Sequence, residues 1–185
     1  LTNSEGNHGE DVKEYYFYLD NTPTHSYMRM LYKYPQAAFP YDDLVRTNRD
    51  RSQDVGEYEL FDALKDQWLQ QRYFDVQVEY AKADPEDVYS RITVTNRGPE
   101  QAVIHVLPHL WYRNTWSWGS PKEDFPAKPP LKAVGESTIL ADHATLGRFR
   151  LHVQPSPAMR FKEWLFTENE TNTQRVFGVP NASPY

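Results

Sequence analysis

The sequence predicts a mainly β protein, an antiparallel β-sandwich with one short helical insertion. Segments rich in aromatic and β-branched residues recur along the chain, and several alternate apolar and polar residues as half-buried strands do. Short stretches rich in Pro, Gly and Asp separate these segments, as sharp reversals of the chain require. At 185 residues the chain is long enough to form one domain with its own hydrophobic core.

The clearest strand is predicted at residues 73–80, where apolar and polar side chains alternate. A turn separates it from a second strand at residues 88–96, and another turn leads to a third strand at residues 102–112. Consecutive strands joined by tight turns predict an antiparallel meander. Further strands are predicted at residues 15–19, 27–34, 136–140, 148–154 and 160–167.

Helix is predicted only between the predicted strands 27–34 and 73–80. Residues 41–51 have a helix start at Asp42 or Asp43, and residues 58–69 carry apolar side chains at helical spacing. These two stretches make up the helical insertion.

Two proline-rich segments are predicted to lie outside the regular structure. Residues 121–130 hold four prolines, which predicts an irregular loop that serves as a lid or as an interdomain strap. Residues 179–185 are typical of a linker or an extended tail. The domain is therefore expected to span residues 1–178.

Composition argues against several classes of protein. The chain has no cysteine, so disulfides, thiol catalysis and cysteine-bound metals are excluded, and a reducing cytoplasm suits it. Its net charge of −6 argues against a nucleic-acid partner. No apolar run approaches the roughly 20 residues of a membrane span, and the first residues lack the pattern of a signal peptide. We therefore expect a cytoplasmic protein without nucleic-acid or membrane partners.

Three of the five tryptophans lie within eight residues, at the end of the predicted strand 102–112. Trp111, Trp116 and Trp118 stand there beside Arg113 and Asn114. An indole ring offers a large flat apolar surface together with one N–H donor. Such a cluster fits a sugar-stacking platform or a domain interface, and the structural alternative is an aromatic corner of the sandwich core.

Other candidate chemistry is weaker. His8 stands near Glu10 and could supply half of a metal site or an acid–base pair. On a strand, His105 and His109 would share a face but lie roughly 13 Å apart, too far to bind one ion. Adjacent carboxylates occur in turn-like surroundings, and no serine lies in a nucleophile elbow. These patterns assign no catalytic residue, no metal and no cofactor.

A specific resemblance is carried by residues 1–16, 23–28, 32–36, 39–41 and 113–119. These stretches resemble the N-terminal part of bacterial glycoside hydrolase family 63-like proteins, relatives of the mannosyl-oligosaccharide (processing) α-glucosidases. The resemblance covers nearly the whole chain and is strongest over residues 1–41 and 73–119.

The resemblance implies an N-terminal β-sandwich of the supersandwich type, followed by a C-terminal toroid of paired helices. It also implies inverting hydrolysis of α-glucosidic bonds by two carboxyl groups roughly 6.5–9.5 Å apart, both supplied by the toroid. Neither maps onto a position of this chain, so the chain alone is expected to be inactive. The chain begins inside the family pattern, which leads us to expect one sheet to be incomplete or to pair with another copy.

We therefore interpret the chain as the non-catalytic N-terminal domain of an α-glucosidase-like hydrolase, packed on the toroid and helping to shape its substrate pocket. Self-association of the isolated domain is expected. The alternatives are a freestanding carbohydrate-binding module that uses the tryptophans, and a small metalloenzyme built on His8, Glu10 and a distant histidine. The candidate substrate- or interface-binding residues are Asn7, His8, Glu10, Asp11, Lys13, Arg113, Trp116 and Trp118.

Overall fold

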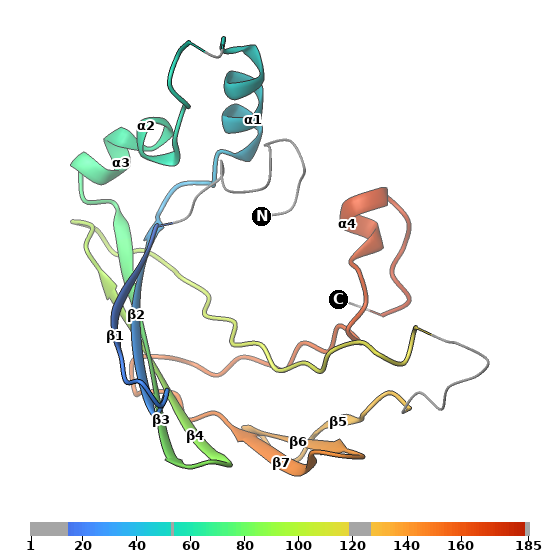
Figure 1. The fold of residues 1–185 in the computed structure, drawn as a ribbon. Coiled ribbons are helices and arrows are strands. Elements are labelled where there is room, and N and C mark those ends of the chain that lie inside the picture. The colour runs from blue at the N-terminus through green and yellow to red at the C-terminus, as the bar shows by residue number, and fades with distance from the viewer. Residues whose placement is uncertain (1–14, 53, 119–126, 184–185) are drawn as a thin grey trace. The chain divides into compact units, whose positions relative to one another are not determined.

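The computed structural model describes residues 15–52, 54–118 and 127–183, and it confirms a mainly β protein (Figure 1). Two antiparallel sheets and a few short helices, the make-up of a β-sandwich, account for its regular structure. In chain order the elements are β1 (Tyr15–Asn21), β2 (Tyr27–Pro35), α1 (Tyr41–Asp50), α2 (Leu60–Ala63), α3 (Lys65–Leu69), β3 (Tyr73–Asp84), β4 (Asp87–Asn96), β5 (Leu131–Ala133), β6 (Thr138–His143), β7 (Gly147–His152) and α4 (Thr173–Phe177).

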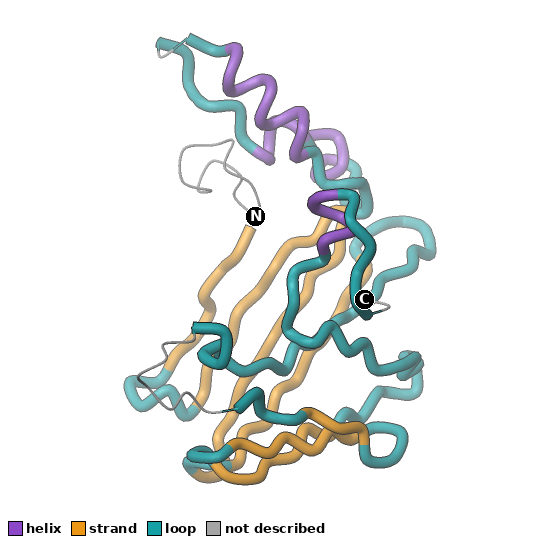
Figure 2. The backbone as a smooth tube through the Cα atoms, turned by 90° about the vertical axis from the view of Figure 1, so that its right-hand side faces the viewer, coloured by secondary structure: helices purple, strands orange, loops and turns teal. Residues whose placement is uncertain are grey.

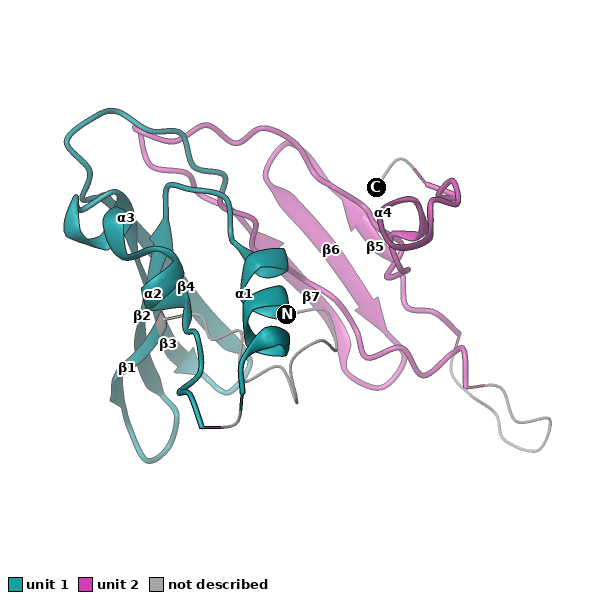
Figure 3. Ribbon diagram, turned by 90° about the horizontal axis from the view of Figure 1, so that it is seen from above, with its two compact units in different colours: residues 1–105 teal, residues 106–185 magenta. Residues whose placement is uncertain are grey.

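The chain divides into two compact units, residues 1–105 and residues 106–185 (Figure 3). The first unit holds β1 to β4 and α1 to α3, and the second holds β5 to β7 and α4. The tryptophan cluster therefore belongs to the second unit.

The first unit is built on a meander in which β1, β2, β3 and β4 are neighbours in that order. Figure 2 shows the long strands of this sheet, in orange, running side by side. Tyr32 of β2 lies opposite Tyr16 of β1 and Val76 of β3. Val76 in turn lies opposite Val94 of β4. Because side chains at paired positions share one face of a sheet, the register alone brings these four residues together.

This register gives the four-stranded sheet an apolar face and a polar face. The rings of Tyr16 and Tyr32 stack on the apolar face, with centroids 4.6 Å apart. Phe74 is the one buried member of this face, and the others are half-buried or exposed. We define the apolar face as Tyr16, Tyr18, Met28, Met30, Tyr32, Tyr34, Phe74, Val76, Val78, Tyr80, Ile92 and Val94.

The predicted helical insertion is confirmed as α1, α2 and α3, which connect β2 to β3 (Figure 1). Leu44, Leu60 and Leu64 form its core, with exposed fractions of 0%, 2% and 6%. A capping box between Glu59 and Asp62 fixes the start of α2, because each side chain accepts a hydrogen bond from the other residue's backbone. None of the described helices is long and apolar enough to cross a membrane.

The side chain of Asn96 fixes the turn that follows β4. Its Oδ1 accepts hydrogen bonds from Gln36 Nε2 at 2.6 Å and from the N–H of Gly98 at 2.8 Å. Its Nδ2 donates to the carbonyl of Glu100 at 2.7 Å. A Cβ at position 98 would lie 2.9 Å from Gln36 Oε1, so the close approach at this turn suits glycine.

In the second unit, β6 is the central strand of the sheet β5-β6-β7. Ile139 and Ala141 of β6 are buried, with exposed fractions of 4% and 3%. The turn from β6 to β7 is closed by Nδ1 of His143, which accepts the backbone N–H groups of Thr145 and Leu146. The fold of this hairpin thus uses a histidine as a turn residue.

Two of the predicted strands are wrong. Residues 102–112 and 160–167 have no regular secondary structure, although six other predicted strands are found as β1, β2, β3, β4, β6 and β7. A strand needs a neighbouring backbone to complete its ladder, and Pro108 lacks the N–H that such a ladder uses. Residues 121–126 of the predicted loop lie outside the described part of the chain.

Candidate functional site

Trp116 and Trp118 lie on a turn that local hydrogen bonds shape, and Trp111 precedes it. The N–H of Ser117 donates to Asn114 Oδ1 at 3.2 Å, and the N–H of Trp118 donates to the carbonyl of Thr115 at 3.3 Å. Asparagine is favoured in such turns because its side chain bonds to the backbone just ahead of it. We call residues 111–118 the tryptophan turn.

The tryptophan turn exposes two of its three indole rings. Trp111 is 64% exposed and Trp118 is 55% exposed, whereas Trp116 is half-buried. The guanidinium carbon of Arg113 lies 5.0 Å from the centre of the Trp118 ring, which is a cation–π distance. Of the predicted site residues, the structure thus brings Arg113 and Trp118 into contact.

The other predicted site residues cannot be placed with them. Asn7, His8, Glu10, Asp11 and Lys13 lie outside the described residues. Within the described ranges, no three His, Cys, Asp or Glu side chains come close enough together to hold a metal ion.

The polar face of the four-stranded sheet holds a carboxylate between two cations. Asp75 is 9% exposed, and its oxygens accept hydrogen bonds from Lys33 Nζ at 2.7 Å and from Arg97 Nε at 2.6 Å. Burial acts to raise the pKa of Asp75, but the hydrogen bonds and charges of Lys33 and Arg97 outweigh it and hold this pKa below its usual range. Asp75 is therefore kept ionised.

A second carboxylate on the same face is bound in the same way. Glu79 is 8% exposed and accepts hydrogen bonds from Arg91 Nε at 2.8 Å and from the hydroxyl of Tyr27 at 2.7 Å. These two donors are the main reason that the pKa of Glu79 is lowered to about 2. A general acid needs the opposite shift, so Asp75 and Glu79 suit ion pairs that join strands rather than proton donation.

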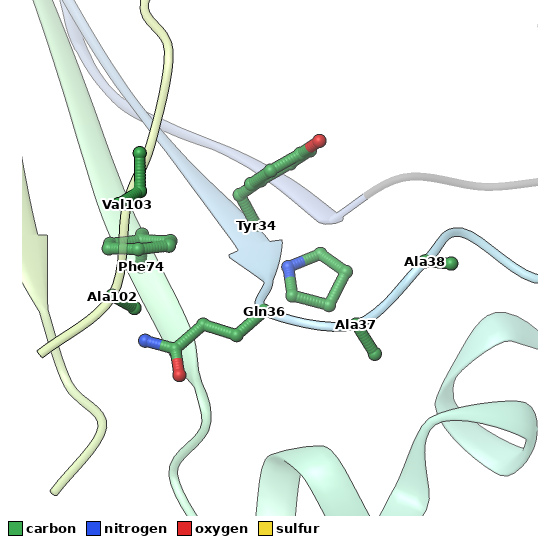
Figure 4. A pocket seen from close by; sticks show the side chains of 8 residues that line it. Tyr34, Gln36, Ala37, Ala38, Phe74, Ala102 and Val103 are labelled. Carbon is green, nitrogen blue, oxygen red and sulfur yellow. The ribbon is translucent and has the colours of Figure 1, made fainter. Parts of the chain in front are cut away.

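The first unit also has a hollow of about 400 Å³ at the end of β2. Figure 4 shows the rings of Tyr34 and Phe74 and the amide of Gln36 at this hollow, with no charged side chain among its lining residues. It therefore offers no acid–base pair. The lining residues are Tyr34, Pro35, Gln36, Ala37, Ala38, Phe74, Ala102 and Val103.

Reasoning from the sequence overlooked the two buried carboxylates. Asp75, Gln77 and Glu79 are at alternate positions of β3, so they lie on the same face of the sheet. That alternation is visible in the sequence, but the cations that pair with them come from β2, from β4 and from the turn after β4. The strand register is needed to recognise the pairs.

The fold and the site define a β-rich protein with an apolar sheet face, of which only Phe74 is buried, and with two exposed indole rings in the tryptophan turn. Among curated proteins, the chain is 40% identical over 213 residues to an uncharacterized protein of Saccharomyces cerevisiae, YMR196W. The match covers all of this chain and 19% of the yeast protein, so the chain spans about a fifth of that relative's length. No family model and no solved structure matches the chain.

Proposed function

We propose that this chain is the non-catalytic β domain of a glycoside hydrolase related to the family 63 α-glucosidases. In this proposal it packs on a helical-toroid catalytic domain of the same polypeptide, in the cytoplasm. The observation that carries the proposal is the apolar face of the four-stranded sheet, where only Phe74 is buried.

The energetics of the sheet favour a partner on the apolar face. Full burial of a Val, Met or Ile side chain contributes about 1.5–3 kcal/mol, and Met30, Val76 and Val78 are each only half-buried. On the opposite face, the two buried carboxylates Asp75 and Glu79 are already paired with cations. A partner is therefore expected to approach from the apolar side.

Three further observations support the proposal. The sequence resembles family 63-like proteins, in which a β-sandwich precedes a catalytic toroid. The yeast relative is about five times as long as the region matched, so there the matched region is one part of a larger polypeptide. The absence of cysteine suits a reducing compartment.

The activity test compares this chain with the longer protein that contains it. Because the catalytic carboxyl groups are proposed to lie in the toroid, the 185-residue chain should leave aryl α-glucosides and short α-linked glucose oligosaccharides intact, and the longer protein should hydrolyse them. In the longer protein, Tyr80→Asp should lower activity at least about tenfold, because it places an unpaired charge in the interface. Tyr80 is 38% exposed, so the same change should lower the melting temperature of the 185-residue chain by only a few degrees.

Thr93→Asp is the matched control. Thr93 is exposed and follows Ile92 on β4, so it lies on the polar face of the sheet, opposite the apolar face. It should leave the activity of the longer protein unchanged. Turnover by the 185-residue chain itself, lost on changing Glu10 or Asp11, would overturn the proposal. So would full activity of the longer protein carrying Tyr80→Asp.

A second candidate function is a freestanding carbohydrate-binding module, and the exposure of Trp111 and Trp118 favours it. A flat indole ring stacks on the C–H face of a sugar ring. Under this candidate, Trp111→Ala should abolish binding of the 185-residue chain to α-linked glucose oligosaccharides in titration calorimetry. Leu107→Ala is the control, since Leu107 is 61% exposed in the same segment but has no ring to stack. Absence of binding by the unaltered chain would dismiss this candidate.

A further inference from the structure

The geometry points to edge-to-edge pairing of β1 with β1 of a second copy of this chain, which would join two four-stranded sheets into one. This inference does not depend on the proposed hydrolase function. β1 is the outer strand of the order β1-β2-β3-β4, so among the described strands it has a neighbour on one side only. An outer strand of this kind is a template for a further strand.

Three side chains of β1 expose apolar surface, and they do so on both faces of the sheet. Phe17 and Leu19 are each 43% exposed, and Tyr18 is 91% exposed. Successive side chains on a strand point to opposite faces, so Phe17 and Tyr18 expose apolar surface on both sides of the same strand. Three consecutive large apolar side chains at this exposure are unusual for an outer strand that faces only water.

The edge of β1 lacks the usual protection against pairing. Residues 15–19 contain no charged residue and no proline, and the irregularity in the pairing with β2 comes only at the end of this run, between Tyr18 and Asp20. The opposite outer strand, β4, differs. It begins at Asp87 and carries Arg91, and charged side chains of this kind discourage edge pairing.

The absence of charged residues from segment 15–19 favours a second copy of this chain as the partner that pairs with the edge of β1. A charged strand laid on residues 15–19 would leave its charges opposite apolar side chains, with nothing to pair with them. In a two-fold antiparallel arrangement the uncharged run of one copy meets the same uncharged run of the other, and aromatic side chains stand across from aromatic or aliphatic ones. Segment 15–19 is thus complementary to itself.

The first test measures association of the 185-residue chain by sedimentation equilibrium. We expect a dimer whose dissociation constant rises at least about tenfold in Tyr18→Lys, because each copy then brings a charge to the shared edge. Tyr89→Lys is the matched control, since Tyr89 is 63% exposed on the other outer strand and should leave the dissociation constant unchanged. A chain that stays monomeric up to about 1 mM, or a dimer that both variants weaken equally, would overturn the inference.

A cysteine scan gives a second test that does not depend on a destabilising change. The chain contains no cysteine, so a single introduced thiol reports one position. Under mild oxidation Phe17→Cys or Tyr18→Cys should form disulfide-linked dimers, because paired strands bring equivalent Cβ atoms near the two-fold axis within disulfide range. Tyr89→Cys should not. Equal crosslinking at positions 17, 18 and 89 would indicate random collision and reject the pairing.

The other candidate partner for the edge of β1 is a strand from elsewhere in the same polypeptide. Experiments on the longer protein distinguish that strand from a second copy of the chain. Phe17→Lys is used here because Phe17 lies on β1 but not on the apolar face. If that protein is monomeric and Phe17→Lys lowers its melting temperature, the edge is filled within one molecule and the second-copy inference fails. If it is a dimer that Phe17→Lys dissociates, the inference holds. In either case the activity comparison with Tyr80→Asp still decides the proposed hydrolase function separately.

Discussion

Replacing Leu44 by alanine should lower the free energy of unfolding of the first unit by about 3 kcal/mol. Leu44 is fully buried and packs with Leu60 and Leu64 in the helical insertion. Removing its branched end loses apolar burial and leaves a cavity that the two neighbouring leucines can fill only in part. Urea denaturation followed by tryptophan fluorescence will measure the change, because Trp68 packs against this cluster.

Leu69→Ala provides the matched control for this substitution. Leu69 is the last residue of α3 and is 68% exposed, so the same chemical change should cost less than about 0.5 kcal/mol. Equal effects of the two substitutions would show that the leucine cluster is not the core of the insertion.

Asp75→Asn should lower the free energy of unfolding by about 2 kcal/mol at neutral pH. The substitution keeps the shape of the side chain but leaves Lys33 and Arg97 without the charge that they share. A fully buried pair would cost more, but the side chains of Lys33 and Arg97 are 31% and 51% exposed, so water compensates for part of the loss. Asp142→Asn is the control, because its pair with Arg148 is exposed on both sides and should contribute less than about 0.5 kcal/mol.

The effect of Asp75→Asn should depend on pH in a defined direction. The pKa of Asp75 is lower in the folded chain than its ordinary value of 3.8, so the folded state binds the proton less readily than the unfolded state does. The stability from this carboxylate is therefore complete above that ordinary value and is lost as the pH falls through the folded pKa. Urea titrations of the two proteins should converge below about pH 4, and a constant difference down to pH 2 would contradict the ion-pair account.

The β-meander was predictable because its signals are local. Alternating residues in β3 and the turn residues after β3 and β4 lie within a few positions of one another, as do the apolar residues of the helical insertion. Residues 102–112 carry the same local signal and still form no strand. Whether such a segment joins a sheet depends on a neighbouring backbone, which can be far away in sequence, so the local pattern cannot decide it.

The candidate site was predictable only in part, for a related reason. Three tryptophans in eight residues are visible in the sequence, but their exposure is set by the fold, which leaves Trp111 and Trp118 exposed and half-buries Trp116. The pair of Lys33 with Asp75 spans 42 positions of the chain and exists only in one register of β2 on β3. A shift of one residue would turn Asp75 to the apolar face.

The hydrogen bonds of Asn96 make the point where the chain leaves the first sheet a fixed position. One amide side chain ties the end of β2, through Gln36, to the turn after β4, through Gly98 and Glu100. Residues added or removed beyond Glu100 would therefore change the length of the following connection without shifting the strands before it. The chain thus leaves the four-stranded sheet at a fixed position, and connections of different lengths can follow from there.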